Sequence, residues 1–147
     1  MPGAKVHATC GAMAGFGSLI VTEPSGKPCS LAVILGRIAG GAVGGLLPDK
    51  LEPAIHPRHR KTCHSVSAGT GISSVVRFAC TLDDAGRMEA DKLRQIASVE
   101  PNTLMNVLNR VCAWIVEFLG SAFVGVIVGY LSHLALDFFS PASIPLI

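Results

Sequence analysis

Three segments of the sequence are almost free of charge and rich in glycine, and they restrict the fold more than any other feature. Residues 8–22 and 118–132 are uncharged runs of fifteen residues each, and residues 29–47 are interrupted only by Arg37. Half of the 147 residues are hydrophobic, 16 are glycine and only 5% are aromatic. Glycine lets the backbones of two apolar helices approach closely. We therefore expect several apolar helices that pack against one another.

Proline, glycine and charge divide the chain into elements. Helices are predicted over residues 4–21, 29–47 and 103–139, with the second helix ending at Pro48. A further helix is expected to begin within residues 66–81, although this segment contains several β-branched residues. The charged residues 83–98 are expected to be solvated. The sequence therefore predicts an all-α fold, a compact bundle of about four to five helices that forms one domain over residues 1–147.

The apolar character leaves two environments open. The mean hydropathy is +0.51, which is high for a soluble domain. A membrane span needs about 20 apolar residues, so runs of fifteen are marginal. The helices are predicted either to associate with a membrane or to be buried in a larger assembly. The net charge of +2 is too small to argue for nucleic acid.

Two titratable residues stand in the most apolar helix. His133 and Asp137 are four residues apart, so their side chains share one helix face with Cβ atoms roughly 6 Å apart. Burying an ionised Asp among Leu and Phe side chains costs several kcal/mol unless the carboxylate is paired or bound to a metal. The pair is either a mutual hydrogen bond that fastens the helix to a neighbour or half of a metal site.

A polar loop and an N-terminal histidine supply further candidate ligands. The loop over residues 48–65 carries side chains of the kind that bind Zn²⁺, which are Asp49, Glu52, His56, His59 and His64. His7 stands at the start of the first apolar helix. The loop is either a solvated connector or, with the helix ends, the wall of a metal pocket. The five cysteines contain no CxxC pair and predict neither a disulfide framework nor a zinc ribbon.

Three motifs together resemble a known family. They are LPD at 47–49, HRKTCHS at 59–65 and GYLSHLALD at 129–137. This pattern resembles the small inner-membrane, metal-dependent hydrolases of the YdjM type, described as LexA-binding. The order of His and Asp residues is also similar to the zinc-dependent phospholipase C and P1 nuclease superfamily. The resemblance implies an inner-membrane location and a substrate that is a phosphoester or a phospholipid.

The residues and the resemblance together suggest roles. One or two divalent ions, Zn²⁺ by preference, are expected to bind the six candidate ligands His7, Asp49, His59, His64, His133 and Asp137. Glu52 is the expected general base, and Arg60 is expected to hold a phosphate oxygen. Family members commonly read LPDID, whereas this chain has Leu51 and then Glu52. Glu52 is therefore a base, a displaced ligand or a solvated residue.

A function of another class stays open beside the hydrolase. The chain would then be a structural or interaction subunit of a membrane complex or a large assembly, such as a viral particle, with a metal site that only organises the fold or is inactive. Structural zinc sites tend to have four closed ligands, often cysteines. Many His and carboxylate candidates without a thiol pair favour an open site, and the oligomeric state is left open.

Overall fold

The computed structural model describes residues 3–22, 29–51 and 66–139, and the described part of the chain is helical and contains no strand. The five helices are α1 (Ala4–Thr22), α2 (Leu31–Leu51), α3 (Val66–Ser74), α4 (Val76–Val99) and α5 (Thr103–Phe138). The predicted all-α bundle is confirmed.

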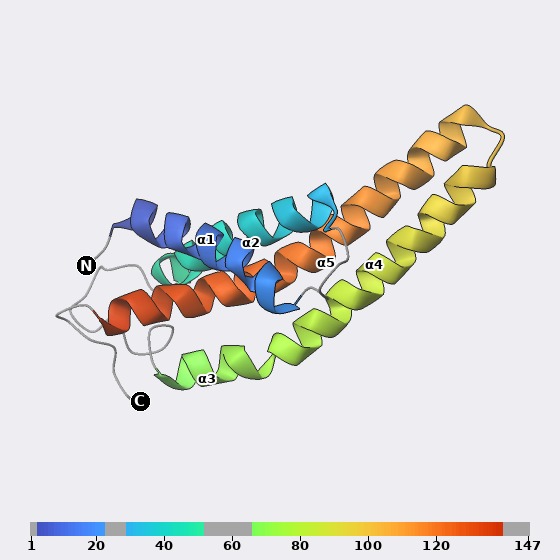
Figure 1. Cartoon of the computed structure of the whole chain (residues 1–147). Coiled ribbons are helices and arrows are strands. Elements are labelled where there is room, and N and C mark those ends of the chain that lie inside the picture. Colours follow the sequence, from blue (N-terminus) through green and yellow to red (C-terminus); the bar gives the residue numbers. More distant parts are fainter. Residues whose placement is uncertain (1–2, 23–28, 52–65, 140–147) are drawn as a thin grey trace.

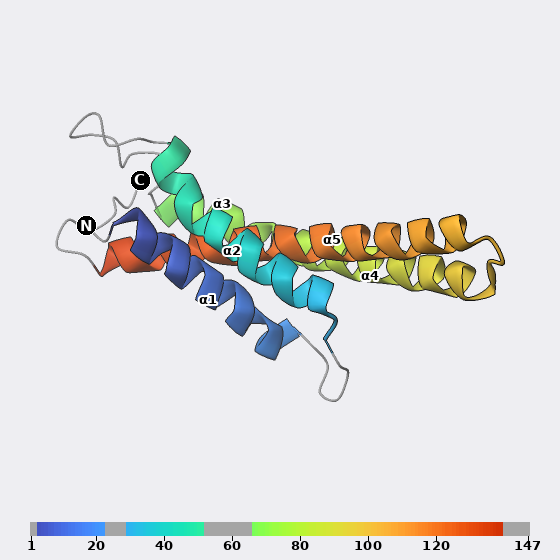
Figure 2. The ribbon, with the colours of Figure 1, turned by 90° about the horizontal axis from the view of Figure 1, so that it is seen from above.

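Helix α5 is the element on which the others are arranged. It packs against each of the other four described helices. Helices α1 and α2 lie along its C-terminal half, and α4 runs antiparallel to it and continues beyond α1 and α2 (Figures 1 and 2). The N-terminal half of α5 and the C-terminal half of α4 thus form a two-helix arm that projects from the bundle.

Glycine allows α1, α2 and α5 to cross with their backbones in contact. A Cβ atom at Gly41 of α2 would overlap the carbonyl oxygen of Gly11 in α1. A Cβ at Gly129 of α5 would overlap the carbonyl oxygen of Gly41, and one at Gly45 that of His7. Larger residues at these positions would hold the three helix axes farther apart. This close approach brings the ends of α1, α2 and α5 together.

The helix ends follow from local chemistry, with one correction to the sequence prediction. The Asn102 side chain accepts hydrogen bonds from the backbone N–H groups of Leu104 and Met105 and so caps α5. Pro48 does not end α2 as predicted, since the helix continues to Leu51. A proline so close to the end removes only one backbone hydrogen bond of the last turn. Asp49 consequently lies on the helix and not in the loop.

The prediction of a solvated segment over residues 83–98 is wrong for one face of α4. Ala79, Asp83, Ala90 and Ala97 are all buried, at spacings of four and seven residues. This spacing places them on one side of an α-helix, which packs against α5, while the intervening charged side chains stay outside. The many charged residues of this segment made its buried face of small residues difficult to recognise from the sequence.

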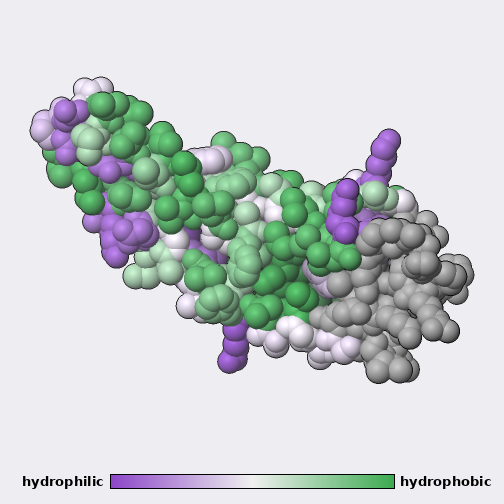
Figure 3. Space-filling model, turned by 180° about the vertical axis from the view of Figure 1, so that it is seen from behind, coloured by the Kyte–Doolittle hydropathy of each residue, from purple (hydrophilic) through white to green (hydrophobic). Residues whose placement is uncertain are grey.

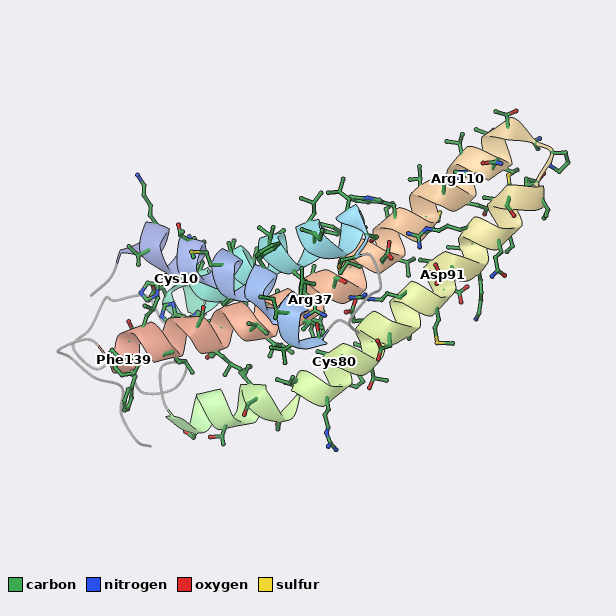
Figure 4. All side chains as sticks on the ribbon, viewed as in Figure 1. Cys10, Arg37, Cys80, Asp91, Arg110 and Phe139 are labelled. Carbon is green, nitrogen blue, oxygen red and sulfur yellow. The ribbon has the colours of Figure 1, made fainter. Side chains whose placement is uncertain are left out.

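A buried ion pair joins α2 to α4 in the middle of the molecule. Arg37 is 1% exposed and donates to the carboxylate of Asp83 at 2.7 Å and to the hydroxyl of Ser18 at 2.9 Å. Arg87 also donates to Asp83 at 3.0 Å, and the hydroxyl of Ser121 donates to its other oxygen. Figure 4 labels Arg37 at this junction. Arg37, the charged residue that interrupts the apolar residues 29–47, is therefore paired with a carboxylate.

The same contacts set the ionisation of Asp83. Burial alone raises the pKa of this carboxyl group, but the hydrogen bonds from Arg87, Ser121 and Arg37 outweigh burial and hold the pKa below its usual value. Asp83 is consequently ionised over the whole range near neutral pH.

The described helices also expose much hydrophobic surface. Helices α2 and α5 are long and apolar enough to cross a membrane, and a core helix of a soluble protein can have the same length and composition. Large apolar side chains that face outward include Phe16, Ile20, Val43 and Leu119. On the face shown in Figure 3, hydrophobic residues cover much of the bundle and continue along the arm between hydrophilic ones.

We predict that Gly41→Ala lowers the free energy of unfolding by about 1–3 kcal/mol or more, because the added methyl group meets backbone atoms that cannot rotate away. Gly17→Ala is the matched control, since a Cβ there has no atom within 4 Å. It should leave stability unchanged or raise it by about 0.5–1 kcal/mol through helix propensity. Thermal unfolding in detergent measures both, and equal effects would contradict the close crossing.

We predict that Asp83→Ala destabilises the protein by about 3–5 kcal/mol, since it leaves the buried Arg37 guanidinium without its carboxylate. The neighbouring Asp84 is exposed, and Asp84→Ala should change stability by no more than about 0.5 kcal/mol. Because the pKa of Asp83 is lowered in the fold, its contribution to stability is present above about pH 4 and is lost as the pH falls further. Acid unfolding of the wild type and of Asp83→Ala, followed by circular dichroism, tests this, and an unchanged acid limb in the variant would contradict it.

Candidate metal centre

Four of the predicted ligands meet at one end of the bundle. His7 lies in the first turn of α1, Asp49 in the last turn of α2, and His133 and Asp137 near the end of α5. Figure 4 shows this end of the bundle, marked by Cys10 on α1 and by Phe139 just beyond α5. The antiparallel direction of α1 and α2 places the start of one beside the end of the other.

The ligand atoms lie close together but beyond hydrogen-bonding distance. His133 Nε2 is 3.7 Å from Asp49 Oδ1 and 3.7 Å from Asp137 Oδ2, and His7 Nε2 is 3.6 Å from Asp137 Oδ1. His7, Asp49 and His133 each offer one ligand atom, and these three atoms all lie within 4.8 Å of one another. This group could therefore hold a metal ion.

A backbone contact fixes the tautomer of His133. Its Nδ1 lies 2.7 Å from the carbonyl oxygen of Gly45. A carbonyl oxygen can only accept, so Nδ1 carries the proton and donates it to this bond. The lone pair of neutral His133 is then on Nε2, which faces the carboxylates of Asp49 and Asp137. Hydrogen bonding of the other ring nitrogen to a carbonyl is how proteins commonly orient a metal-binding histidine.

The rings of the two cluster histidines stack on each other. The centroids of the His7 and His133 rings are 3.8 Å apart, and the ring planes differ by 23°. The Nδ1 atom of His7 is buried and makes no hydrogen bond within the described part of the chain. Stacking thus holds two imidazole rings side by side within the cluster.

The donor set fits a divalent cation. In a tetrahedral site with metal–ligand bonds of about 2.0–2.1 Å, neighbouring ligand atoms are about 3.3–3.4 Å apart. The separations of 3.6–3.7 Å are close to that value and exceed the range of about 2.7–3.2 Å for hydrogen bonds. The cluster therefore has the spacing of metal ligands.

Burial differs among the four residues and gives the cluster an open side. His7 is 1% exposed, and His133 and Asp137 are fully buried. The side chain of Asp49 is 36% exposed. Structural metal sites are closed by protein ligands, whereas sites that act on a substrate keep a position open. Among the four described members of the cluster, Asp49 is thus the one that solvent reaches most.

Several predicted residues lie outside the described part of the chain. These are the candidate ligands His59 and His64, the candidate base Glu52 and the phosphate-binding Arg60. The sequence analysis also missed the Gly45 carbonyl, because any residue type can supply a backbone oxygen. The only available signal was position, since Gly45 precedes Asp49 by four residues and so lies on the same face of α2.

Comparison of the chain with known protein families, with curated proteins and with solved structures gives no match. The interpretation of the cluster consequently rests on its own geometry.

We predict that the purified protein binds a divalent metal ion and that His133→Ala or Asp137→Ala weakens this binding by more than about 100-fold, which exceeds the usual effect of changing a residue that only supports a ligand. Ser132→Ala is the matched control, because this hydroxyl donates to the carbonyl of Gly129 in its own helix. Elemental analysis and calorimetric titration measure the metal. Stoichiometric metal in both alanine variants would exclude the cluster as the binding site.

Proposed function

We propose that this protein is a membrane-associated, metal-dependent hydrolase that cleaves phosphoesters, with His7, Asp49, His133 and Asp137 as ligands of a divalent ion. The observation that carries the proposal is the 2.7 Å contact between His133 Nδ1 and the Gly45 carbonyl, which turns Nε2 toward the carboxylates of Asp49 and Asp137. Zn²⁺ is the preferred ion, because imidazole nitrogen and carboxylate oxygen are ligands typical of catalytic zinc sites.

The chemistry of the site follows from its parts. When bound, a divalent ion supplies a Lewis acid that lowers the pKa of a water molecule toward neutrality and polarises the phosphoryl group. His133 is held in one tautomer, and the burial of Asp137 and the two imidazoles keeps water from their side of the cluster. Substrate would approach beside the partly exposed Asp49. Glu52 and Arg60 keep their proposed roles as base and phosphate-binding group.

The lengths of the helices support a position across a membrane, with the metal ligands near one of its surfaces. The 21 residues of α2 span about 31 Å, which matches the hydrocarbon core of a bilayer of about 30 Å. The 36 residues of α5 extend about 54 Å, so only its C-terminal half beside α2 would lie in the bilayer. The metal ligands would then lie at one boundary, and the arm of α4 and α5 would project from the other. The inner membrane is the location that the family resemblance implies.

We predict that the zinc-loaded protein in detergent hydrolyses bis(p-nitrophenyl) phosphate, with release of p-nitrophenol as the measured signal. A chelator should abolish the reaction and added zinc should restore it. Asp137→Ala should lower the rate by about a hundredfold or more, as expected for a loss of several kcal/mol of transition-state stabilisation.

Asp84→Ala is the control for the loss of a carboxylate, because Asp84 is exposed on α4. Its rate should equal that of the wild type. Metal at full stoichiometry without turnover of any phosphoester would instead favour the structural subunit, in which the ion only ties the helix ends together. Absence of bound metal would exclude the hydrolase and leave an interaction subunit whose site is inactive.

A further inference from the structure

We propose that the two-helix arm is a dimerisation surface, on which a second copy of this chain binds along an apolar stripe of α5. The stripe consists of four outward-facing side chains of the arm, which are Leu104, Leu108, Val111 and Ile115. Each of them is between 44% and 70% exposed. The inference rests on the proposed position across a membrane and does not depend on the proposed hydrolysis.

The stripe continues the face of α5 that α2 covers farther along. A Cβ atom at Gly36 of α2 would overlap the carbonyl oxygen of Phe118, and one at Gly40 would overlap that of Ala122. From the stripe to Ala122, successive positions are alternately four and three residues apart, so they lie along one side of the helix. Figure 2 shows that α1 and α2 do not reach the arm. The same side of α5 therefore has a helix partner in one half and none among the described residues in the other.

The charged side chains in this half of α5 are engaged away from the stripe. Between residues 103 and 117 they are Arg110 and Glu117. Arg110 Nε donates to Oδ1 of Asn106 at 2.8 Å, and the amide of Asn106 donates to the carbonyl of Ala97 in α4. The carboxylate of Glu117 accepts a hydrogen bond from Arg94 of α4. The stripe is therefore left as an uncharged surface on the side away from these contacts.

Lipid does not suit this surface, because of the charges on the neighbouring helix. In the arm, the side chains of Asp91 and Lys92 on α4 are 71% and 63% exposed. Charged side chains that face hydrocarbon are costly, so this part of α4 is expected to lie outside the bilayer core. The half of α5 that packs beside it lies at the same height. The stripe would thus face water unless a protein surface covers it.

A second copy fits the stripe because two chains in one membrane share their orientation. Their arms project from the same boundary in the same direction, as a two-fold axis along the membrane normal requires. In this parallel pair each stripe residue lies opposite its own counterpart. Leu108 and Ile115 occupy a positions of a heptad repeat, and Leu104 and Val111 occupy d positions, as in parallel coiled coils. Since none of the four is charged, pairing in register brings no like charges together.

The size of the surface agrees with a pair that the membrane aligns. Val107, Trp114 and Leu119 flank the stripe and are 42–59% exposed. A standard protein interface uses about 20–30 residues from each partner, and the arm offers fewer. Two copies held in one bilayer with one orientation lose less rotational and translational freedom on pairing than free molecules do. We therefore expect an α5–α5 contact that forms in the membrane and weakens on dilution in detergent.

The test uses the full-length protein in the membranes of the expressing cells. The five native cysteines are changed to serine, and one cysteine is introduced, either Val111→Cys on the stripe or Gln95→Cys on the exposed face of α4. Copper phenanthroline then oxidises close thiols, and a non-reducing gel measures the dimer. Because a disulfide requires Cα atoms within about 7 Å, Val111→Cys should give about tenfold more dimer than Gln95→Cys.

A charge on the stripe should separate the two copies. Leu108→Asp, added to the Val111→Cys variant, would place two carboxylates opposite each other, and the yield of dimer should fall to that of Gln95→Cys. Gln95→Asp is the matched control, since it adds the same charge to the outer face of α4, and it should leave the yield unchanged. Leu108 is half exposed, so the substitution is compatible with the fold, and thermal unfolding verifies this.

Two results would overturn the pairing. They are equal yields of dimer from Val111→Cys and Gln95→Cys, and a yield that Leu108→Asp does not lower. No step of the test requires metal or turnover, so a failure of the phosphoester assay would leave the crosslinking result valid. Conversely, absence of the dimer would leave the proposed hydrolase untouched. Recovery of the protein in the soluble fraction would remove the membrane position and overturn the pairing with it.

Discussion

The contact between three helix backbones is the constraint on which the candidate site depends. Gly11, Gly41 and Gly129 let α1, α2 and α5 cross at a distance that any side chain would increase. His7, Asp49 and His133 have short side chains, and none could reach the others if the axes moved apart by the width of a methyl group or two. The polar cluster therefore depends on the glycines, because they set the distance between the helices that carry its side chains.

Much of the fold follows from sequence patterns, and the exceptions have physical causes. The uncharged segments predicted α1, α2 and α5 closely, because apolar helices of this length need little tertiary information. The prediction that α2 ends at Pro48 was wrong because a proline near a helix end removes only one backbone hydrogen bond. The stripe on α4 was hidden because alanine at seven-residue spacing gives a weak hydrophobic signal among charged neighbours. Arg37 required a buried carboxylate, but the choice of Asp83 depended on how α4 packs.

For the candidate site, sequence spacing was sufficient where two residues share one helix and insufficient elsewhere. His133 and Asp137 lie four residues apart, so their proximity is a local property of α5. The convergence of His7 and Asp49 with them depends on three helix directions and on α2 continuing past Pro48 to include Asp49. Whether any of residues 52–65 completes the site remains a prediction, because they lie outside the described residues.

The two polar clusters lie at different positions along the bundle. Arg37 and Asp83 join α2 to α4 midway along the bundle, and the histidines and carboxylates gather eight residues farther along α2, around Gly45 and Asp49. The inner cluster is held together by its own ion pairs, from Arg37 and Arg87 to Asp83. Of the two clusters, the outer one brings together imidazole and carboxylate groups that could hold a metal ion.

The hydrogen bond between His133 and Gly45 has a consequence for how this site can change over generations. Its acceptor is a main-chain oxygen, so no single codon change on α2 deletes it. A substitution at Gly45 would act by pushing away α1 through the carbonyl of His7 and not by removing the acceptor. The orientation of His133 is in this sense encoded by the backbone of α2 and not by any one side chain of that helix.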